Sequence, residues 1–305
     1  MVRLLILLCA ALLSAMPSLA CEITTEARDT GIKAYVENGQ ACLKTPPEGF
    51  YFDANMEQNL VRRFNAERTK IGLAPLTIRT EMLPAARFHS MDMGYNAFFG
   101  HKSPNEKGHG FRISAFDRTQ LLTKSAENVA SYVAGETVCS DYAGNTISCE
   151  GLYEQLSPDP QTVEDYFFKG LMESEGHRAN ILDKDLTDTA VGIAYGNYGF
   201  YFTQVFSRPV GMLKTPLALE VKATKPVPAI ATIPGWNFAN FGLGGDDVPK
   251  DIFDNVVPMT ELGDRTLYVR ARTIETKEVA SGLQQITRTL YATGPEMTVI
   301  APTGS

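Results

Sequence analysis

The feature that most constrains the fold of this chain is a change in hydrophobic period at about residue 190. Before that point, apolar residues recur at helical spacing over 55–72, 80–99 and 159–176. After it, apolar and polar residues alternate over 191–195, and a second β-rich run follows at 200–206, with a Gly-containing turn between the two runs. This order predicts a series of helices followed by an antiparallel hairpin.

Local signals predict where individual helices begin. Asn55, with Gln58 three residues later, is typical of a capping box, and Asp159-Pro160 is typical of a helix start. A further short helix is predicted over 125–134, where it would carry Glu127 among mainly apolar residues. The side chain of Glu127 would then face either solvent or an interior polar site.

The N-terminal segment 1–20 is typical of a secretory signal peptide. Arg3 precedes ten apolar residues, and small residues stand just before Cys21. A helix of ten residues is too short for the roughly 30 Å hydrocarbon core of a membrane, and no later segment is long enough, so we expect no transmembrane span. The chain is therefore expected to be secreted or periplasmic.

Cysteine usage agrees with an exported protein. If Cys9 leaves with the signal peptide, Cys21, Cys42, Cys139 and Cys149 remain, and an even number suggests two disulfides. Local pairing, Cys21 with Cys42 and Cys139 with Cys149, is the cheapest of three possible arrangements. In the alternative, Cys21 is acylated as in a lipoprotein, although Ser18-Leu19-Ala20 matches the usual preceding residues poorly.

The net charge excludes one class of partner, and the residue pattern of the C-terminal region predicts its structure. The formal net charge is −7 and the cations are scattered, so nucleic acid is not an expected partner. From residue 215 to 305, short β-like runs alternate with turns rich in Pro and Gly, which predicts a small β-rich appendage. The segment 242–245 resembles a phosphate loop in composition only, and we interpret it as a plain turn.

The sequence contains four histidines, and two of them are candidates for a functional site. His101 and His177 each follow a predicted helix end beside a glycine, a position that suits a metal ligand or a proton carrier. For His89 and His109 we expect ordinary hydrogen-bonded roles.

Four motifs occur in order over about 150 residues: GHKSP, AENVA, GHRANIL, and AVGIAYG followed by YFTQVF. Together they resemble the CAP superfamily, the SCP domain of cysteine-rich secretory and pathogenesis-related proteins, and in particular its bacterial branch. The resemblance covers residues 53–210, so that 21–52 would be an N-terminal extension. It implies a fold of the α+β class, a three-layer α-β-α sandwich, followed here by the C-terminal appendage.

The resemblance also implies a cleft with His101, His177 and Glu127, in which the two histidines can hold a divalent metal, usually zinc. Two imidazoles are an incomplete set of protein ligands for Zn²⁺, so we expect weak binding. The second glutamate of the family falls on Ser174, flanked by Glu173 and Glu175, and nothing in the spacing shows that either replaces it.

Arg178 and Asn180 match the bacterial motif and are expected to brace the loop around His177.

Three functions follow as hypotheses. The first is a secreted module that binds a metal or an unknown small ligand, and we expect this ahead of an enzyme. The second is a metal-assisted hydrolase, a peptidase or esterase, with Glu127 or a histidine as general base acting on metal-bound water; the sequence offers it no nucleophile elbow and no HExxH motif. The third is a structural or adhesive envelope protein that binds an envelope component.

Overall fold

The computed structural model of the chain describes most residues from Cys21 onward: 21, 23, 31–104, 106–133, 138–140, 146–148, 159–196, 199–227, 229–244, 251–259, 262–279 and 282–302. The predicted signal peptide 1–20 lies outside the described residues, as does Cys149, so the predicted pair of Cys139 with Cys149 lies there too. No helix in the described ranges is both long enough and apolar enough to cross a bilayer.

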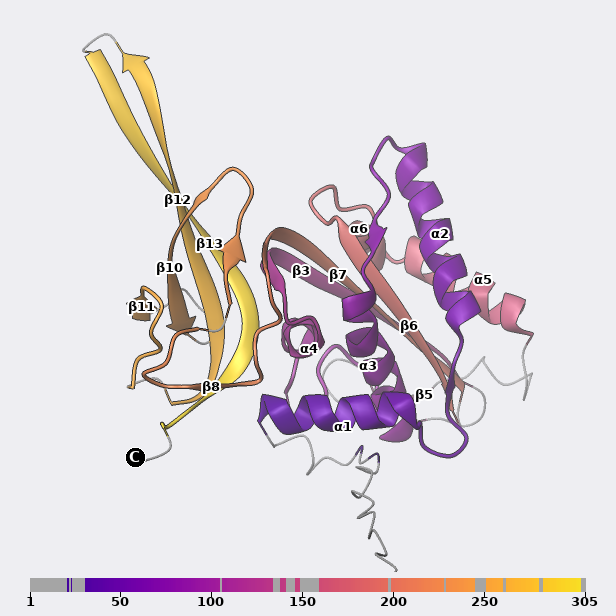
Figure 1. Ribbon diagram of the computed structural model, residues 1–305. Coiled ribbons are helices and arrows are strands. Elements are labelled where there is room, and N and C mark those ends of the chain that lie inside the picture. The colour runs from indigo at the N-terminus through magenta and orange to yellow at the C-terminus, as the bar shows by residue number, and fades with distance from the viewer. Residues whose placement is uncertain are drawn as a thin grey trace, which may run out of the picture.

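Four antiparallel strands form the middle layer of the first half of the chain (Figure 1). Their order across the sheet is β1, β6, β7 and β3, and their bounds are Tyr51–Phe52, Asp188–Gly196, Gly199–Leu213 and Gln120–Val133. Outside this path lie β2 (Thr77–Ile78), which pairs with β6, and a separate ladder of β4 (Val138–Ser140) with β5 (Thr146–Ser148).

Helices cover both faces of this sheet. On one face lie α2 (Ala54–Lys70), α5 (Pro160–Glu173) and α6 (Glu175–Ile181), and on the other lie α1 (Ile32–Lys44), α3 (Leu83–Tyr95) and α4 (His109–Phe116). A short 3-10 helix, Thr80–Met82, leads into α3. The result is the α-β-α sandwich that the resemblance implies.

Strand β7 shows why the middle layer needs two covers. Phe202 and Phe206 pack with α2 and α5, whereas Val205 packs with residues of α3 and α4. Successive side chains of a strand point to opposite faces, so this run of apolar residues buries both faces of the sheet. The predicted hairpin of β6 and β7 is confirmed, and its aromatic residues form core.

Close contact between α3 and the sheet depends on Gly192 in β6. A Cβ atom at this position would lie 2.3 Å from the backbone nitrogen of Arg87. Ser90 on α3 then reaches across the same contact and donates a hydrogen bond to the Gly192 carbonyl oxygen at 2.9 Å. This contact places the end of α3, and hence the loop that follows it, beside the sheet.

Two local predictions were wrong. Residues 125–134 were expected to form a helix, but up to Val133 they belong to strand β3, which pairs with β7 along nearly its whole length. The available partner strand decided the conformation, because β-structure depends on neighbours more than on local propensity. The helix expected to run to Gly176 ends at Glu173, since Ser174 starts a new helix, α6.

Among the smaller details, one differs from the predictions and the others agree with them. The N-cap of α2 is Asp53, which accepts hydrogen bonds from the backbone of Asn55 and Met56, so the predicted capping residue lies two positions too late. Gly72, with φ of 79°, ends this helix as expected. The predicted start of α5 at Asp159-Pro160 is confirmed. The Cys21–Cys42 disulfide is present and ties the N-terminal segment to α1.

The C-terminal region is β-rich, as predicted. Its strands are β8 (Glu220–Lys222), β9 (Ala231–Thr232), β10 (Asn237–Gly244), β11 (Asp251–Phe253), β12 (Gly263–Val279) and β13 (Gly282–Ile300). Glycines 242 and 244 lie within strand β10, so the segment expected to be a turn is regular sheet up to Gly244. Strands β12 and β13 form a long ribbon whose far end projects from the molecule (Figure 1).

The two halves of the molecule share one sheet and one apolar cluster. Strand β13 pairs with β3 at a single position, Thr293 with Leu122. Leu121 and Leu213, from the first half, are buried in a cluster with residues of the C-terminal region such as Leu267. The C-terminal region is therefore packed against the sandwich through apolar contact.

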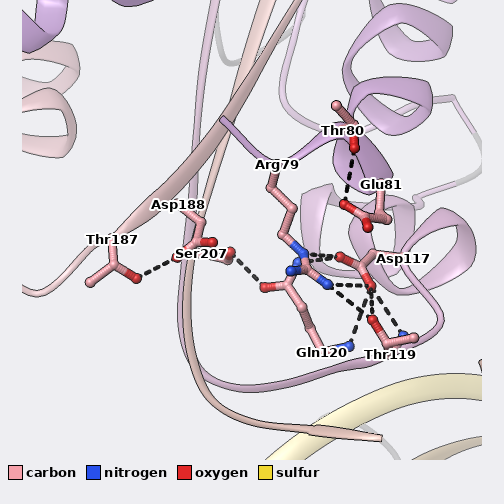
Figure 2. Close-up of polar contacts among 9 residues, drawn as sticks. All are labelled: Arg79, Thr80, Glu81, Asp117, Thr119, Gln120, Thr187, Asp188 and Ser207. Atoms are coloured by element: carbon pink, nitrogen blue, oxygen red, sulfur yellow. Dashed lines mark hydrogen bonds and ion pairs between the residues drawn. The ribbon is translucent and has the colours of Figure 1, made fainter. Parts of the chain in front are cut away.

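A buried polar cluster braces the sandwich side of this junction (Figure 2). The Asp117 carboxylate, with a fully buried side chain, pairs with Arg79 and accepts hydrogen bonds from Gln120 and Thr119. Gln120 in turn accepts a hydrogen bond from Ser207 at 2.7 Å. Every polar group at the start of β3 named here therefore has a partner within the protein.

Candidate functional site

Strand β3 places the Glu127 carboxylate in the interior, on the side of the sheet that faces α4. Only 1% of the Glu127 side chain is exposed, and Arg112 on α4 is fully buried beside it. The Arg112 Nη2 donates to Glu127 Oε2 at 2.6 Å. Burial opposes the charge of Glu127, but the Arg112 charge and hydrogen bonds from His101 and Arg112 outweigh it and lower the pKa of Glu127 to about 2. The carboxylate is therefore ionised.

Arg112 was not among the predicted site residues, yet its guanidinium joins three parts of the site. Besides Glu127, it donates to the carbonyl oxygen of His101 at 2.8 Å and to that of Lys107 at 2.7 Å. These bonds hold the loop between α3 and α4 against strand β3. The available signal was an arginine inside the apolar run GFRISAF, at a position that helical spacing assigns to the core.

His101 lies in this loop and connects the buried carboxylate to the surface. Its Nδ1 lies 3.1 Å from Glu127 Oε1, and 36% of its side chain is exposed. A carboxylate accepts the proton of the ring nitrogen that faces it, which leaves the lone pair on Nε2. His101 therefore presents an oriented, basic nitrogen away from Glu127.

His177 lies on α6, within a helix rather than after one. Burial of the half-buried ring, followed by the charge of nearby His101, lowers the pKa of His177. Its carbonyl oxygen accepts a hydrogen bond from Asn128 at 3.1 Å, and Asn180 donates to both Asn128 and the Glu127 carbonyl oxygen. These bonds attach α6 to β3 beside Glu127, and the charge of His101 acts on His177.

The remaining predicted site residues lie where α5 ends and α6 begins. Ser174 is the residue shared between the end of α5 and the start of α6, and the Glu173 and Glu175 side chains on either side are exposed. Among the described residues, no group of three or more His, Cys, Asp or Glu side chains is placed to hold a metal ion. The protein groups established for this site are the His101 imidazole, with Glu127 behind it, and the His177 imidazole, whose pKa responds to the charge of His101.

The other two histidines differ from each other. His89 is fully buried, its Nε2 lies 2.9 Å from the Gly100 carbonyl oxygen, and burial lowers its pKa to about 3. It is a neutral core residue that supports the loop before His101. His109, at the start of α4, lines a cavity of about 680 Å³ together with His101. Burial lowers the pKa of His109 as well.

Comparison with known proteins places much of the first half of the chain in a known family. Residues 61–206 match the cysteine-rich secretory protein family, CAP. The uncharacterized protein YkwD of Bacillus subtilis (strain 168) is 32% identical over 150 residues, which cover 49% of this chain and 46% of YkwD. The chain therefore spans less than half of that relative.

Two solved structures are similar over about half of this chain. One is an extracellular protein containing an SCP domain from Bacillus anthracis str. Ames, with 25% identity, a TM-score of 0.36, and coverage of 50% of this chain and 40% of that one. The other is an outer surface protein from Borrelia burgdorferi, with 14% identity, a TM-score of 0.39, and coverage of 52% of this chain and 98% of that one. The family match identifies residues 61–206 as a CAP domain, and it does not extend to the C-terminal region.

Proposed function

We propose that this chain is a secreted binding module whose CAP domain holds a divalent metal ion or a small ligand at His101 and His177. The observation that carries the proposal is the contact between Glu127 and His101, 3.1 Å long. Arg112 already pairs with the buried, ionised Glu127 carboxylate, so compensating its charge does not require the partly exposed ring of His101. What the contact achieves is to fix the ring of His101 and the nitrogen that it presents.

The donor set suits a weakly held metal ion. Imidazole must be neutral to coordinate, and the lowered pKa of His177 favours that form at neutral pH. Two protein ligands leave about two positions of a tetrahedral site for water or for a ligand atom. A bound Zn²⁺ would place a positive charge in the site, and an anionic group of a ligand could replace the water at its open positions.

The hydrolase alternative has less support at Glu127. A general base works best with a pKa near the working pH, whereas the pKa of Glu127 is about 2 and both of its oxygens accept hydrogen bonds. Secretion is supported by the signal-like segment 1–20 and by the Cys21–Cys42 disulfide, which suits an oxidising compartment. Anchoring at Cys21 and a purely adhesive envelope role are the competing proposals.

Zinc titration of the full mature chain by calorimetry tests the site. We expect His101→Ala and His177→Ala each to weaken Zn²⁺ binding at least tenfold, and the double variant to lose it. His109→Ala is the matched control and should bind as the unmodified protein does. If the double variant keeps the same affinity and stoichiometry, the ion is not held by these histidines and the proposal fails.

A further inference from the structure

Two cavities lie side by side along the junction between the CAP domain and the C-terminal region. The larger, of about 680 Å³, and the smaller, of about 250 Å³, share Gly110, Phe111, Thr266 and Glu296 among their lining residues. We call these two adjoining cavities together the junction groove. One wall comes from described residues of the loop and of α4, among them His101, Lys107 and Ser114. The other is formed by the ends of β12 and β13 that lie nearest to β3, and β3 itself lines the smaller cavity at residues 122–125.

The groove exists because one sheet divides at this point. Strand β13 pairs with β3 at Thr293 and Leu122, and the ladder between them does not extend beyond that position. Irregular register flanks the division on both sides, at Leu121–Lys124 in β3 and at Thr266–Tyr268 in β12. Bulges bend strands and are frequent beside binding sites. Helix α4 lies beside β3 (Figure 1) and contributes Gly110, Phe111 and Ser114 to the lining of the smaller cavity.

Hydrogen bonds from a buried residue hold the wall on the CAP side in place. Arg112 is fully buried and holds the carbonyl oxygens of both His101 and Lys107, so the loop that lines the larger cavity is fixed at two points. On the facing wall, Asp264 accepts a hydrogen bond from Thr298 at 2.6 Å, which joins β12 to β13. Preorganised walls reduce the entropic cost of binding.

The charges of the larger cavity select the class of ligand. Among its described lining residues are three cationic side chains, Lys102, Lys107 and Arg265, and three anionic ones, Glu106, Asp264 and Glu296; Lys102 and Glu106 pair with each other at 2.8 Å. Such a balance disfavours polyanions and polycations alike, because each would meet like charges. It suits a chain that carries groups of both signs.

Among such chains, a peptide fits better than a glycan. Sugars usually pack on an aromatic face, but the Phe111 ring in the larger cavity is already covered by the Lys107 ammonium group, 4.4 Å from the ring centre. The smaller cavity is rich in hydroxyl side chains, among them Ser114, Thr123 and Thr293. Two diverging strands leave a slot for a third extended chain, a recurring mode of peptide recognition.

We propose that the junction groove binds an extended peptide with charges of both signs, between the CAP domain and the C-terminal region. The C-terminal region is then one wall of a ligand site and determines its specificity. This inference goes beyond the metal or small-ligand function proposed above and does not depend on a bound metal, although His101 borders both sites.

Gly110 offers a direct test, because it lines both cavities and a Cβ atom there would meet nothing within 4 Å. Gly110→Phe should fill the groove without a clash in α4. Gly110→Ala adds a methyl group and is the matched control. Gly170→Phe, on α5, is the control for a large side chain, since a Cβ atom at Gly170 also meets open space. Thr266→Trp blocks the groove from the opposite wall.

The probe is a fluorescent pool of random hexapeptides, measured by equilibrium binding to the full mature chain, with chitohexaose in a parallel arm. We expect the unmodified protein, Gly110→Ala and Gly170→Phe to retain the same peptides, and Gly110→Phe and Thr266→Trp to bind at least tenfold less. Arg265→Glu should shift the retained peptides toward cationic ones.

Thermal melts establish that each variant is folded, and Zn²⁺ titration of Gly110→Phe should match the unmodified protein, which separates this test from that of the metal site. Lack of peptide retention by the unmodified protein overturns the proposal, as does retention that both blocking variants leave unchanged. Binding of chitohexaose in place of peptides would assign the groove to glycans and overturn the peptide assignment.

Discussion

Two buried carboxylates in this molecule are each paired with an arginine, and a comparison of their surroundings separates a structural cluster from a functional one. Asp117 pairs with Arg79, and Glu127 pairs with Arg112; the exposed fraction of the carboxylate side chain is 0% and 1%. In both cases the arginine and further hydrogen bonds outweigh burial and lower the carboxyl pKa. Charge, burial and pKa direction are therefore the same in the two clusters.

The difference lies in the next partner. Asp117 accepts a hydrogen bond from Gln120, and Gln120 accepts one from Ser207. This chain of contacts therefore ends inside the protein, beside the junction with the C-terminal region (Figure 2). The second oxygen of Glu127 instead meets His101, which is about one third exposed and lines a cavity. A perturbed pKa identifies a candidate site only when the chain of contacts ends at a surface that a ligand can reach.

The largest effect that would sharpen this comparison is expected from Arg112→Ala. Removing one partner of a buried ion pair typically costs about 3 to 5 kcal/mol, because the other charge stays buried without compensation. Arg112 is fully buried and also holds two loop carbonyls, whereas Arg79 is 14% exposed, so we expect Arg79→Ala to cost less. Urea unfolding at pH 7 measures both.

The double variant Arg112→Ala with Glu127→Gln is the control for this prediction. It removes the orphaned charge and should recover part of the lost stability. Equal costs for Arg112→Ala and Arg79→Ala, with no recovery in the double variant, would show that ion pairing is not what holds the loop.

A somewhat smaller effect is expected from pH. The pKa of Glu127 falls from 4.5 to about 2 on folding, so its contribution to stability is complete above pH 4.5 and is lost as pH falls toward 2. At 1.36 kcal/mol per pKa unit, this contribution is on the order of 3 kcal/mol. Glu127→Gln should therefore flatten the fall in unfolding free energy between pH 5 and pH 2.

Asp117→Asn should flatten the same fall, since the pKa of Asp117 is also lowered in the folded protein. The measurement is the free energy of unfolding at several pH values for the three proteins. An acid-induced loss of stability in Glu127→Gln as steep as in the unmodified chain would contradict the prediction.

Much of the fold followed from periodicity and punctuation in the sequence. Long amphipathic segments predicted α2, α3 and α5, and the turn before Gly199 predicted the hairpin of β6 and β7. Each of these elements carries its own signal in consecutive residues. Strand β3 does not, since its conformation comes from pairing with β7, about 70 to 90 residues away in the chain.

The site shows the same limit. Motif resemblance brought His101, His177 and Glu127 together, and the structure places Glu127 against His101. The motif resemblance could not predict Arg112, because the role of this residue depends on three contacts with the loop and with β3. Likewise, the groove beside His101 depends on β12 and β13, which are more than 150 residues away from it in the chain.

The smallest expected effect is that of His101→Ala on stability, and it tests the comparison most directly. With His101 removed, Glu127 still pairs with Arg112, and water from the cavity can reach the oxygen that the ring had covered. We therefore expect a loss of less than about 0.5 kcal/mol, as for other partly exposed positions away from a core.

Gln120→Ala, at the matching position beside Asp117, removes a side chain that is only 2% exposed and leaves Asp117 and Ser207 each short of a partner. Its expected cost is about 1 to 3 kcal/mol, the penalty for buried polar groups without hydrogen bonds. Urea unfolding gives both values, and Zn²⁺ titration of the same two proteins should show the reverse order, with binding weakened by His101→Ala and unchanged by Gln120→Ala. If His101→Ala costs as much stability as Gln120→Ala, His101 is part of the structural frame, and the distinction drawn between the two carboxylate clusters does not hold.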